Sequence, residues 1–344
     1  MTNPFEERLG AFVAKLRERK LDCALVYGEA NIRSLTGVAC DSACLVVSAR
    51  TVVLFTDFRY VPMVHRTAPW LPVKDIKTLK RIKAGRRVGY ESSVSHARYL
   101  RLETLFPKAE FVDVAKDLSD LRAVKTPEEI AKLAAAEALN DRIWSLAQKQ
   151  FRAGMTELEM ARIIRRLMID LGEGETFETI VCVGKNAAEC HHVPDGTVWN
   201  GREPVLVDMG VKLDGYCSDM TRNLVPKRAS RLYRQVYALV LEANRRAIAA
   251  AKPGMTAGAL DAVARKFLAA NGFGKAFGHS LGHGVGLEIH EAPTARKGDG
   301  TVLEEGMLVT IEPGVYLEDN LGVRIEDLVV ITADGCRVLS ASAK

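Results

Sequence analysis

The sequence lacks a long uninterrupted apolar run. No uncharged stretch approaches the ~18 residues that a membrane-spanning helix needs, and the opening residues MTNPFEERLG are polar and carry acidic side chains. It also lacks a compact cysteine pattern, because its seven cysteines make an odd number without regular spacing. A disulfide framework is therefore not expected. We expect a cytoplasmic protein with reduced thiols and no membrane partner.

Strong charge of one sign is also missing. The formal net charge of +5 is the difference between 48 basic and 43 acidic residues in a chain of 344, so no strongly anionic partner is implied. The densest basic stretch, residues 74–87, has no aromatic side chains interleaved for base stacking. We interpret it as a solvated surface and expect no nucleic-acid partner.

The length and the order of the sequence patterns favour two domains. Residues 4–20 are amphipathic and residues 43–55 hold two β-rich runs, which predicts an α/β domain over residues 1–121. The sequence TPEE from Thr126 then combines a capping box with a proline in the first turn, so a helix begins there. That helix opens a second domain, residues 122–344.

The second domain contains an internal repeat. Gly154-Met-Thr and Gly254-Met-Thr each precede a predicted helix, and later matches follow in the same order. The shared order and the near-constant spacing predict two similar α+β halves that face each other across a pseudo-two-fold axis. The seam between such halves is a natural place for a site. The later matches pair His191 with His290, Pro194 with Pro293, Asp208 with Glu312, and Asp219 with Glu326.

Acidic residues interrupt strands that are otherwise apolar. Burying an unpaired carboxylate costs several kcal/mol or shifts its pKa until it neutralises, so Asp208, Glu312 and Glu326 need a compensating charge. Together with Asp219 and a neutral His283 they carry a charge of about −4, which two divalent cations would balance, and this donor set suits Mn²⁺, Co²⁺ or Zn²⁺. The spacing predicts facing positions on a hairpin for the two aspartates, and the two glutamates repeat that arrangement.

Residues 279–291 read HSLGHGVGLEIHE, which resembles the signature of the pita-bread metallopeptidases, specifically the proline-specific branch of prolidase and aminopeptidase P. The resemblance implies a creatinase-like α/β N-terminal domain, an α+β pita-bread catalytic domain with pseudo-two-fold internal duplication, and a homodimer. It also implies hydrolysis of peptides that have proline at the second position. The other similar blocks are VLVDMG at 205–210, SDMTR at 218–222, IEPGVY at 311–316, RIED at 324–327 and, less specifically, 31–37 and 56–60.

The same resemblance implies a dinuclear metal site. Asp208 would chelate one ion and His283 with Glu312 the other, while Asp219 and Glu326 would bridge the two. The ions, Mn²⁺ or Co²⁺ in first place and Zn²⁺ as an alternative, would hold a bridging hydroxide that attacks the peptide bond. Glu312 would accept the proton that the bridging water loses when it becomes this hydroxide.

Further roles follow from the resemblance and from the repeat. His191 and His290 would hydrogen-bond the scissile carbonyl and stabilise the oxyanion. The internal match selects His191 over His192. Arg324 would orient a metal ligand, and His279 would contact the substrate or hydrogen-bond a loop.

The chain departs from the family pattern at two positions, the first in a loop and the second relevant to substrate length. Cys190 stands where relatives usually have proline, and Thr294 follows Pro293 where prolidases often have an arginine for the terminal carboxylate of a dipeptide. Arg296 could supply that cation instead. We therefore expect both Xaa-Pro dipeptides and longer Xaa-Pro peptides to be substrates.

Three other functions are compatible with parts of the pattern. A methionine aminopeptidase resembles the second domain but commonly lacks the first. A metal-free creatinase-like hydrolase and a non-catalytic pita-bread binding module both typically lose several metal ligands. All five ligand positions are retained here, so a metallopeptidase is the favoured interpretation.

Overall fold

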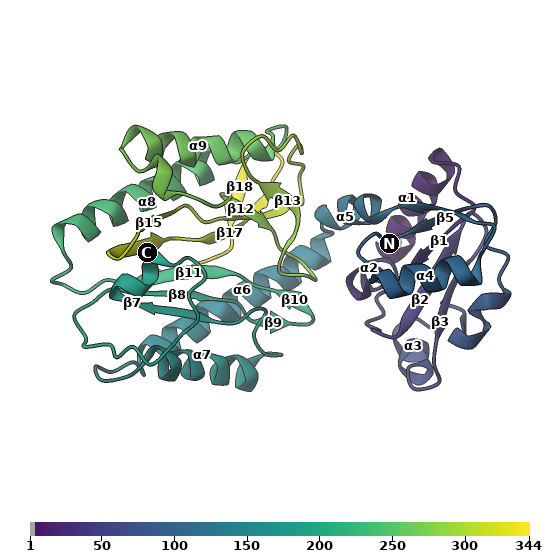
Figure 1. Ribbon diagram of the computed structural model, residues 1–344, viewed down its shortest axis with the longest axis horizontal. Helices are drawn as coiled ribbons and strands as arrows, with labels where there is room; N and C mark the ends of the chain where they lie inside the picture. Colours follow the sequence, from purple (N-terminus) through teal and green to yellow (C-terminus); the bar gives the residue numbers. More distant parts are fainter. Residues whose placement is uncertain (1–3) are drawn as a thin grey trace. The chain divides into compact units, whose positions relative to one another are not determined.

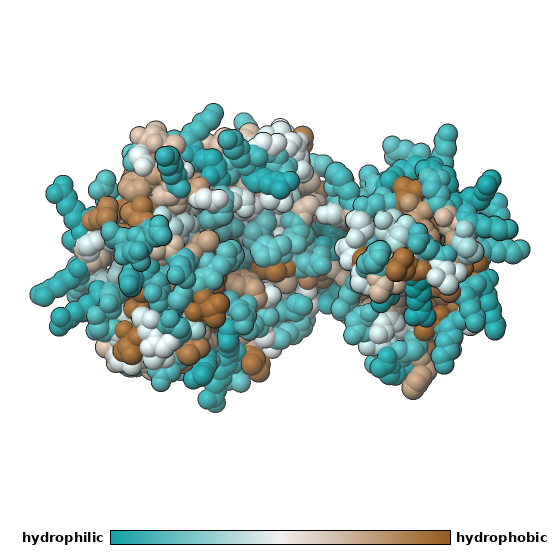
Figure 2. Space-filling model, viewed as in Figure 1, coloured by the Kyte–Doolittle hydropathy of each residue, from teal (hydrophilic) through white to brown (hydrophobic). Residues whose placement is uncertain are grey.

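The computed structural model describes residues 4–344 and divides the chain into two compact units, one ending at Arg122 and the other beginning at Ala123. Among the described residues, no helix is long and apolar enough to cross a membrane. Hydrophilic side chains predominate on the face in Figure 2, and apolar ones are scattered among them. The lysines of the basic stretch 74–87 are exposed, as expected of a solvated surface.

The N-terminal unit is built on a six-stranded mixed sheet of order β4-β3-β2-β1-β5-β6. Its elements are α1 (Pro4–Glu18), β1 (Cys23–Val26), α2 (Glu29–Thr36), β2 (Ala43–Ser48), β3 (Val52–Thr56), α3 (Val61–Thr67), β4 (Val73–Asp75), η1 (Ile76–Arg81), β5 (Arg87–Tyr90), α4 (His96–Leu105), β6 (Glu110–Asp113) and α5 (Ala115–Ala123). Successive side chains of a strand point to opposite faces. In β1, Ala24 and Val26 accordingly join one apolar core with α1, while Cys23 and Leu25 join another with α4. The sheet is therefore covered on both faces.

The second unit places its strands between two pairs of helices (Figure 1). Thr126 and Thr156 both form the capping boxes that the sequence predicts. The elements are α6 (Pro127–Gln148), α7 (Glu157–Leu171), β7 (Ile180–Val183), η2 (Gly184–Ala188), β8 (Val205–Met209), β9 (Lys212–Leu213), β10 (Tyr216–Cys217), β11 (Met220–Leu224), α8 (Arg231–Ala250), α9 (Ala257–Ala270), η3 (Gly274–Ala276), β12 (Gly282–Gly284), β13 (Glu291–Ala295), β14 (Leu308–Ile311), β15 (Gly314–Leu317), β16 (Leu321–Arg324), β17 (Asp327–Ile331) and β18 (Cys336–Val338).

The internal duplication is confirmed in the geometry of these elements. Each half contributes two long helices and an antiparallel strand pair, β8 with β11 and β14 with β17. The turn before the second helix of each half makes matching pairs of backbone hydrogen bonds, between Gly154-Met155 and Trp199 and between Gly254-Met255 and Leu303. Both glycines have a positive φ, 96° and 81°, which most other residues adopt only with strain.

Candidate metal centre

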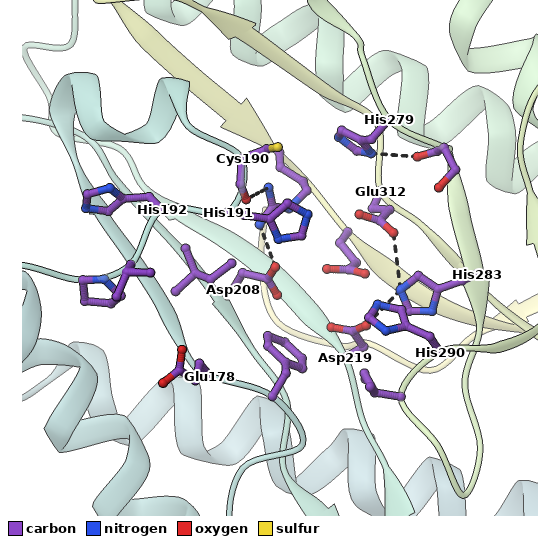
Figure 3. Close-up of a pocket in the computed structure, with 18 of the residues that line it drawn as sticks. Glu178, Cys190, His191, His192, Asp208, Asp219, His279, His283, His290 and Glu312 are labelled. Carbon is purple, nitrogen blue, oxygen red and sulfur yellow. Dashed lines mark hydrogen bonds and ion pairs between the residues drawn. The ribbon is translucent and has the colours of Figure 1, made fainter. Parts of the chain in front are cut away.

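The five predicted metal ligands meet in one cavity of about 480 Å³, which the second unit alone lines. Asp208 lies in β8, Asp219 directly precedes β11, and His283 lies in β12. Glu312 directly follows β14 and Glu326 directly precedes β17. In Figure 3 Asp208 and His191 lie on one side of the cavity, with His283, His290 and Glu312 on the other. The two halves of the duplication therefore both contribute donors.

Strand register explains how these side chains converge. The β14–β17 ladder ends with Ile311 opposite Asp327, so the next residues outward, Glu312 and Glu326, face each other as expected. The corresponding expectation for the aspartates is wrong, because Asp208 pairs with Thr221. Asp219 lies one residue before β11, since the chain between β8 and β11 makes an additional small β9–β10 hairpin.

The distances suit a cation held among the side chains. His283 Nε2 lies 3.5 Å from a carboxylate oxygen of Asp219 and 3.5 Å from one of Glu312. Donor atoms of Asp219, His283 and Glu326 lie within 4.8 Å of one another. Asp208 Oδ1 is buried and has no hydrogen-bond partner among the described residues. An orphaned buried carboxylate oxygen is what a missing cation would leave behind.

The electrostatics support the same conclusion. Burial, reinforced by the neighbouring carboxylates, raises the pKa of Asp219 and of Glu326 well above their usual values. Burial likewise raises the pKa of Glu312 to about 8 and lowers the pKa of His283 to about 4. Neutral imidazole is the metal-binding form of histidine, and divalent cations stabilise ionised carboxylates. The residues present therefore fit a divalent metal centre.

Arg324 holds two of the ligands in place. Its Nη2 donates to Asp208 Oδ2 at 2.6 Å and its Nε donates to Thr221 Oγ1 at 3.0 Å. The Thr221 hydroxyl in turn donates to Glu326 Oε2 at 2.7 Å. Arg324 thus orients Asp208 directly and reaches Glu326 through Thr221. In the sequence, nothing singles out Thr221 beyond its place in the SDMTR block.

His279 lines the cavity and forms hydrogen bonds with Ser280 and Tyr316. Its Nδ1 lies 2.7 Å from the carbonyl of Ser280, which can only accept, so Nδ1 donates and Nε2 accepts from the Tyr316 hydroxyl at 2.9 Å. Arg324 Nη1 also donates to the Tyr316 hydroxyl, at 2.8 Å. Burial lowers the pKa of His279 to about 4, which agrees with a neutral ring. Sequence reasoning assigned no role to Tyr316.

A buried glutamate of α6 supports the backbone beside Asp219. Glu137 Oε2 accepts from the backbone N–H of Asp219 at 3.1 Å, and Glu137 Oε1 accepts from the Ser340 hydroxyl at 2.6 Å. Burial raises the pKa of Glu137 to about 8. The next residues of the tail, Ala341 and Ser342, donate backbone N–H groups to Asp141. The only sequence signal for Glu137 is an acidic residue in an alanine-rich run.

The remaining predicted residues lie in different places. His191 and His290 are exposed to the cavity, and the ring centroids of His290 and His283 are 4.3 Å apart. His192 and Thr294 also line it. Arg296 is not among the lining residues; its side chain is 69% exposed and lies 3.6 Å from Asp299.

A duplicated α+β unit with this donor set in one cavity defines a metallopeptidase. The profile described as Metallopeptidase family M24 matches residues 131–333, and that of the Creatinase/Prolidase N-terminal domain matches residues 8–124. The chain belongs to metallopeptidase family M24.

Similar proteins match over nearly the whole chain. The chain is 34% identical to a Xaa-Pro dipeptidase of Pyrococcus furiosus, covering 98% of this chain and 99% of that protein. The solved Xaa-Pro dipeptidase from Bacillus anthracis gives a TM-score of 0.95 at 31% identity, covering 99% and 98% of the two chains. The solved X-Pro aminopeptidase from Thermotoga maritima gives 0.86 at 32% identity, covering 95% and 97%. The full-length likeness confirms the expected two-domain fold.

Proposed function

We propose that the protein hydrolyses the bond between the first residue of a peptide and a following proline, using two divalent ions. The observation that carries this proposal is the convergence of Asp208, Asp219, His283, Glu312 and Glu326 on one cavity. The Xaa-Pro names of the full-length relatives support the choice of bond. We further propose that the enzyme is a cytoplasmic homodimer with the catalytic site in residues 122–344.

The charge of the site supports two ions. Four carboxylates and a neutral imidazole carry a charge of about −4, and mixed oxygen and nitrogen donors suit Mn²⁺ or Co²⁺, with Zn²⁺ as the alternative. Asp208 would hold one ion, His283 and Glu312 would hold the other, and Asp219 and Glu326 would contribute to both. When bound, the ions supply a water-derived nucleophile at neutral pH and polarise the peptide carbonyl.

The chain supplies the remaining chemistry. Glu312, which lines the cavity beside His283, accepts the proton that the attacking water loses. His191 and His290 face the cavity from the two halves and donate hydrogen bonds to the oxygen of the scissile carbonyl as its negative charge develops. Arg324 keeps Asp208 and Thr221 in place. His279, bonded to Tyr316 and Ser280, shapes the substrate-side wall.

The cavity also bears on substrate length. Arg324 is the one lysine or arginine among the described residues that line the cavity, and its guanidinium already bonds Asp208, Thr221 and Tyr316. Binding the terminal carboxylate of a dipeptide requires a cationic side chain that is not already paired with other groups. Thr294 cannot supply one, and Arg296 lies outside the lining. We therefore propose that longer Xaa-Pro peptides are cleaved as well as dipeptides.

Metal-free enzyme reconstituted with each ion tests these proposals. Ala-Pro, Ala-Pro-Ala and a Met-Ala peptide are assayed side by side, and bound metal is counted by mass spectrometry. Cleavage of both proline peptides but not of the Met-Ala peptide supports the proposal. Preference for Met-Ala would favour a methionine aminopeptidase, and undiminished turnover without metal would exclude the mechanism. Arg296→Ala should leave the dipeptide KM within about twofold, since its contribution would be that of one exposed charge.

A further inference from the structure

Each proposed catalytic histidine is followed by an ionisable residue whose side chain contacts a buried ionisable partner. His192 follows His191 and meets Glu157; Glu291 follows His290 and meets Lys125. We propose that Glu157 and Lys125 are positioning residues, each of which sets the place of one histidine by anchoring the residue after it. This inference rests on the proposed roles of His191 and His290.

In the first half the anchor is a carboxylate. Glu157, the first residue of α7, is fully buried. Its Oε2 accepts from His192 Nε2 at 2.8 Å and from the backbone N–H of Asp195 at 3.1 Å. Its Oε1 accepts from the backbone N–H of Val183 at 2.6 Å and from Asn186 Nδ2 at 3.0 Å. Glu157 therefore ties the end of β7 to the loop that carries His191.

The same contacts decide between an anchor and a second metal site. Glu157, His192 and Asp195 offer atoms close enough to hold an ion. Both oxygens of Glu157 are already occupied by four donors, and an Asp195 oxygen accepts from the backbone N–H of Thr197 at 2.7 Å. Burial opposes a charge on His192, but the hydrogen bond to Glu157 and its charge raise the pKa of His192 overall. The cluster is a paired imidazole and carboxylate.

For His290, in the second half, the anchor is a cation from the segment just before α6. Lys125 Nζ lies 2.7 Å from Glu291 Oε1, and the two side chains are only 3% and 2% exposed. The backbone N–H of Lys125 donates to the carbonyl of Gly306 at 3.0 Å, so the lysine is itself fixed. A Cβ on Gly286 would lie 2.0 Å from Glu291 Oε1. Glycine at that position leaves room for the buried carboxylate.

The two anchors have opposite charges, and the two halves of the repeat differ in sequence at the corresponding position. The residue after the helix cap is Glu157 in the first half and Ala257 in the second, so the second half has no carboxylate there. A buried charge is costly unless it is paired, and pairing in a dry interior fixes position closely. A misplacement of a catalytic group by about 1 Å can lower a rate ~10²-fold. An anchor on the adjacent residue can therefore affect kcat by setting the position of the histidine ring.

Double variants test which histidine each anchor positions. Lys125→Met is measured in the parent, in His290→Ala and in His191→Ala. We expect kcat to fall roughly 10- to 100-fold in the parent and in His191→Ala, with no further loss in His290→Ala. Glu157→Gln should show the opposite dependence, with no further loss in His191→Ala only. Metal content should match the parent throughout.

Several outcomes overturn the inference and stay distinct from failure of the proposed function. If His191→Ala and His290→Ala retain the parental kcat, the proposed function fails first. If they lose activity while each anchor variant costs the same factor in every background, the anchors are merely structural and the inference is wrong. Should Lys125→Met not fold, Lys125→Met/Glu291→Gln removes both charges at once and enters the same comparison. Lys125→Arg, which keeps the charge, should retain most activity.

Discussion

In the first half of the second unit, Asn140 of α6 donates to the carbonyl of Met209 at the end of β8. In the second half, Asn244 of α8 donates to the carbonyl of Ile311 at the end of β14, and both distances are 2.9 Å. Beside these matched contacts, the neighbouring strands of the two halves, β7 and β12, make different contributions. Ile180 of β7 pairs with Asp208, whereas His283 of β12 donates its backbone N–H to Thr310 of β14.

The comparison shows that the repeat places four of the five proposed ligands in equivalent positions, Asp208 with Glu312 and Asp219 with Glu326, whereas His283 has no counterpart. The shared helix-to-strand contacts fix where each strand ends, and the ends are where the carboxylates stand. The first half contributes two of the proposed ligands and the second half three. The one nitrogen donor comes from a strand whose counterpart is wholly apolar. A site at a pseudo-symmetric seam therefore need not be symmetric.

The largest effect should come from the proposed bridging ligands, one from each half. Asp219→Ala and Glu326→Ala should both abolish activity and both lose metal, because each is expected to serve two ions. Metal content and kcat are measured on the same samples. Full occupancy of two ions in either variant would refute the bridging role.

The two exposed histidines test whether the halves contribute equally to the transition state. His191→Ala and His290→Ala should each lower kcat by ~10²-fold or more, the usual cost of an oxyanion donor, with metal retained. His192→Ala should be milder, because His192 acts only through its neighbour. If His192→Ala cost as much as His191→Ala and the loss persisted in a His191→Ala background, the internal alignment would be shifted by one residue.

The matched asparagines test the scaffold itself. Asn140→Ala and Asn244→Ala should each lower the free energy of unfolding by about 1–3 kcal/mol, the cost of an unsatisfied buried partner. The second should cost more, because Asn244 also donates to Asp327 Oδ2 at 2.9 Å and accepts from Lys344 at 3.1 Å. Urea unfolding measures both. Equal losses would show that the extra contacts contribute little.

The smallest effect is a pH dependence of the metal-free protein. Burial raises the folded-state pKa of Glu312 from 4.5 to about 8, so the folded state holds this proton more tightly than the unfolded chain. The resulting stabilisation is complete below pH 4.5 and is lost as the pH rises through 8. The unfolding temperature should therefore fall between pH 5 and pH 8 without metal. Glu312→Gln should flatten that slope, and an unchanged slope would contradict the assignment.

Much of this arrangement could be predicted from local patterns. The capping boxes at Thr126 and Thr156 depend only on neighbouring residues, and the repeat exposed the pairing of Glu312 with Glu326. The position of Asp219 relative to Asp208 depends on an inserted hairpin, which periodicity does not resolve. Thr221, Tyr316 and Glu137 are residues of ordinary type, and their roles arise only from long-range contacts.

Residues 340–342 are synthesised after all five proposed metal ligands, which sets an order in which the contacts of the site can form. Ser340 holds Glu137, which in turn holds the backbone of Asp219, yet Glu137 is made some two hundred residues before Ser340. All five proposed ligands leave the ribosome before the residue that satisfies this buried glutamate. The nascent chain therefore carries its proposed metal ligands for a period in which the support behind Asp219 is absent. The fully supported form of the proposed site exists only after Ser340 has reached Glu137.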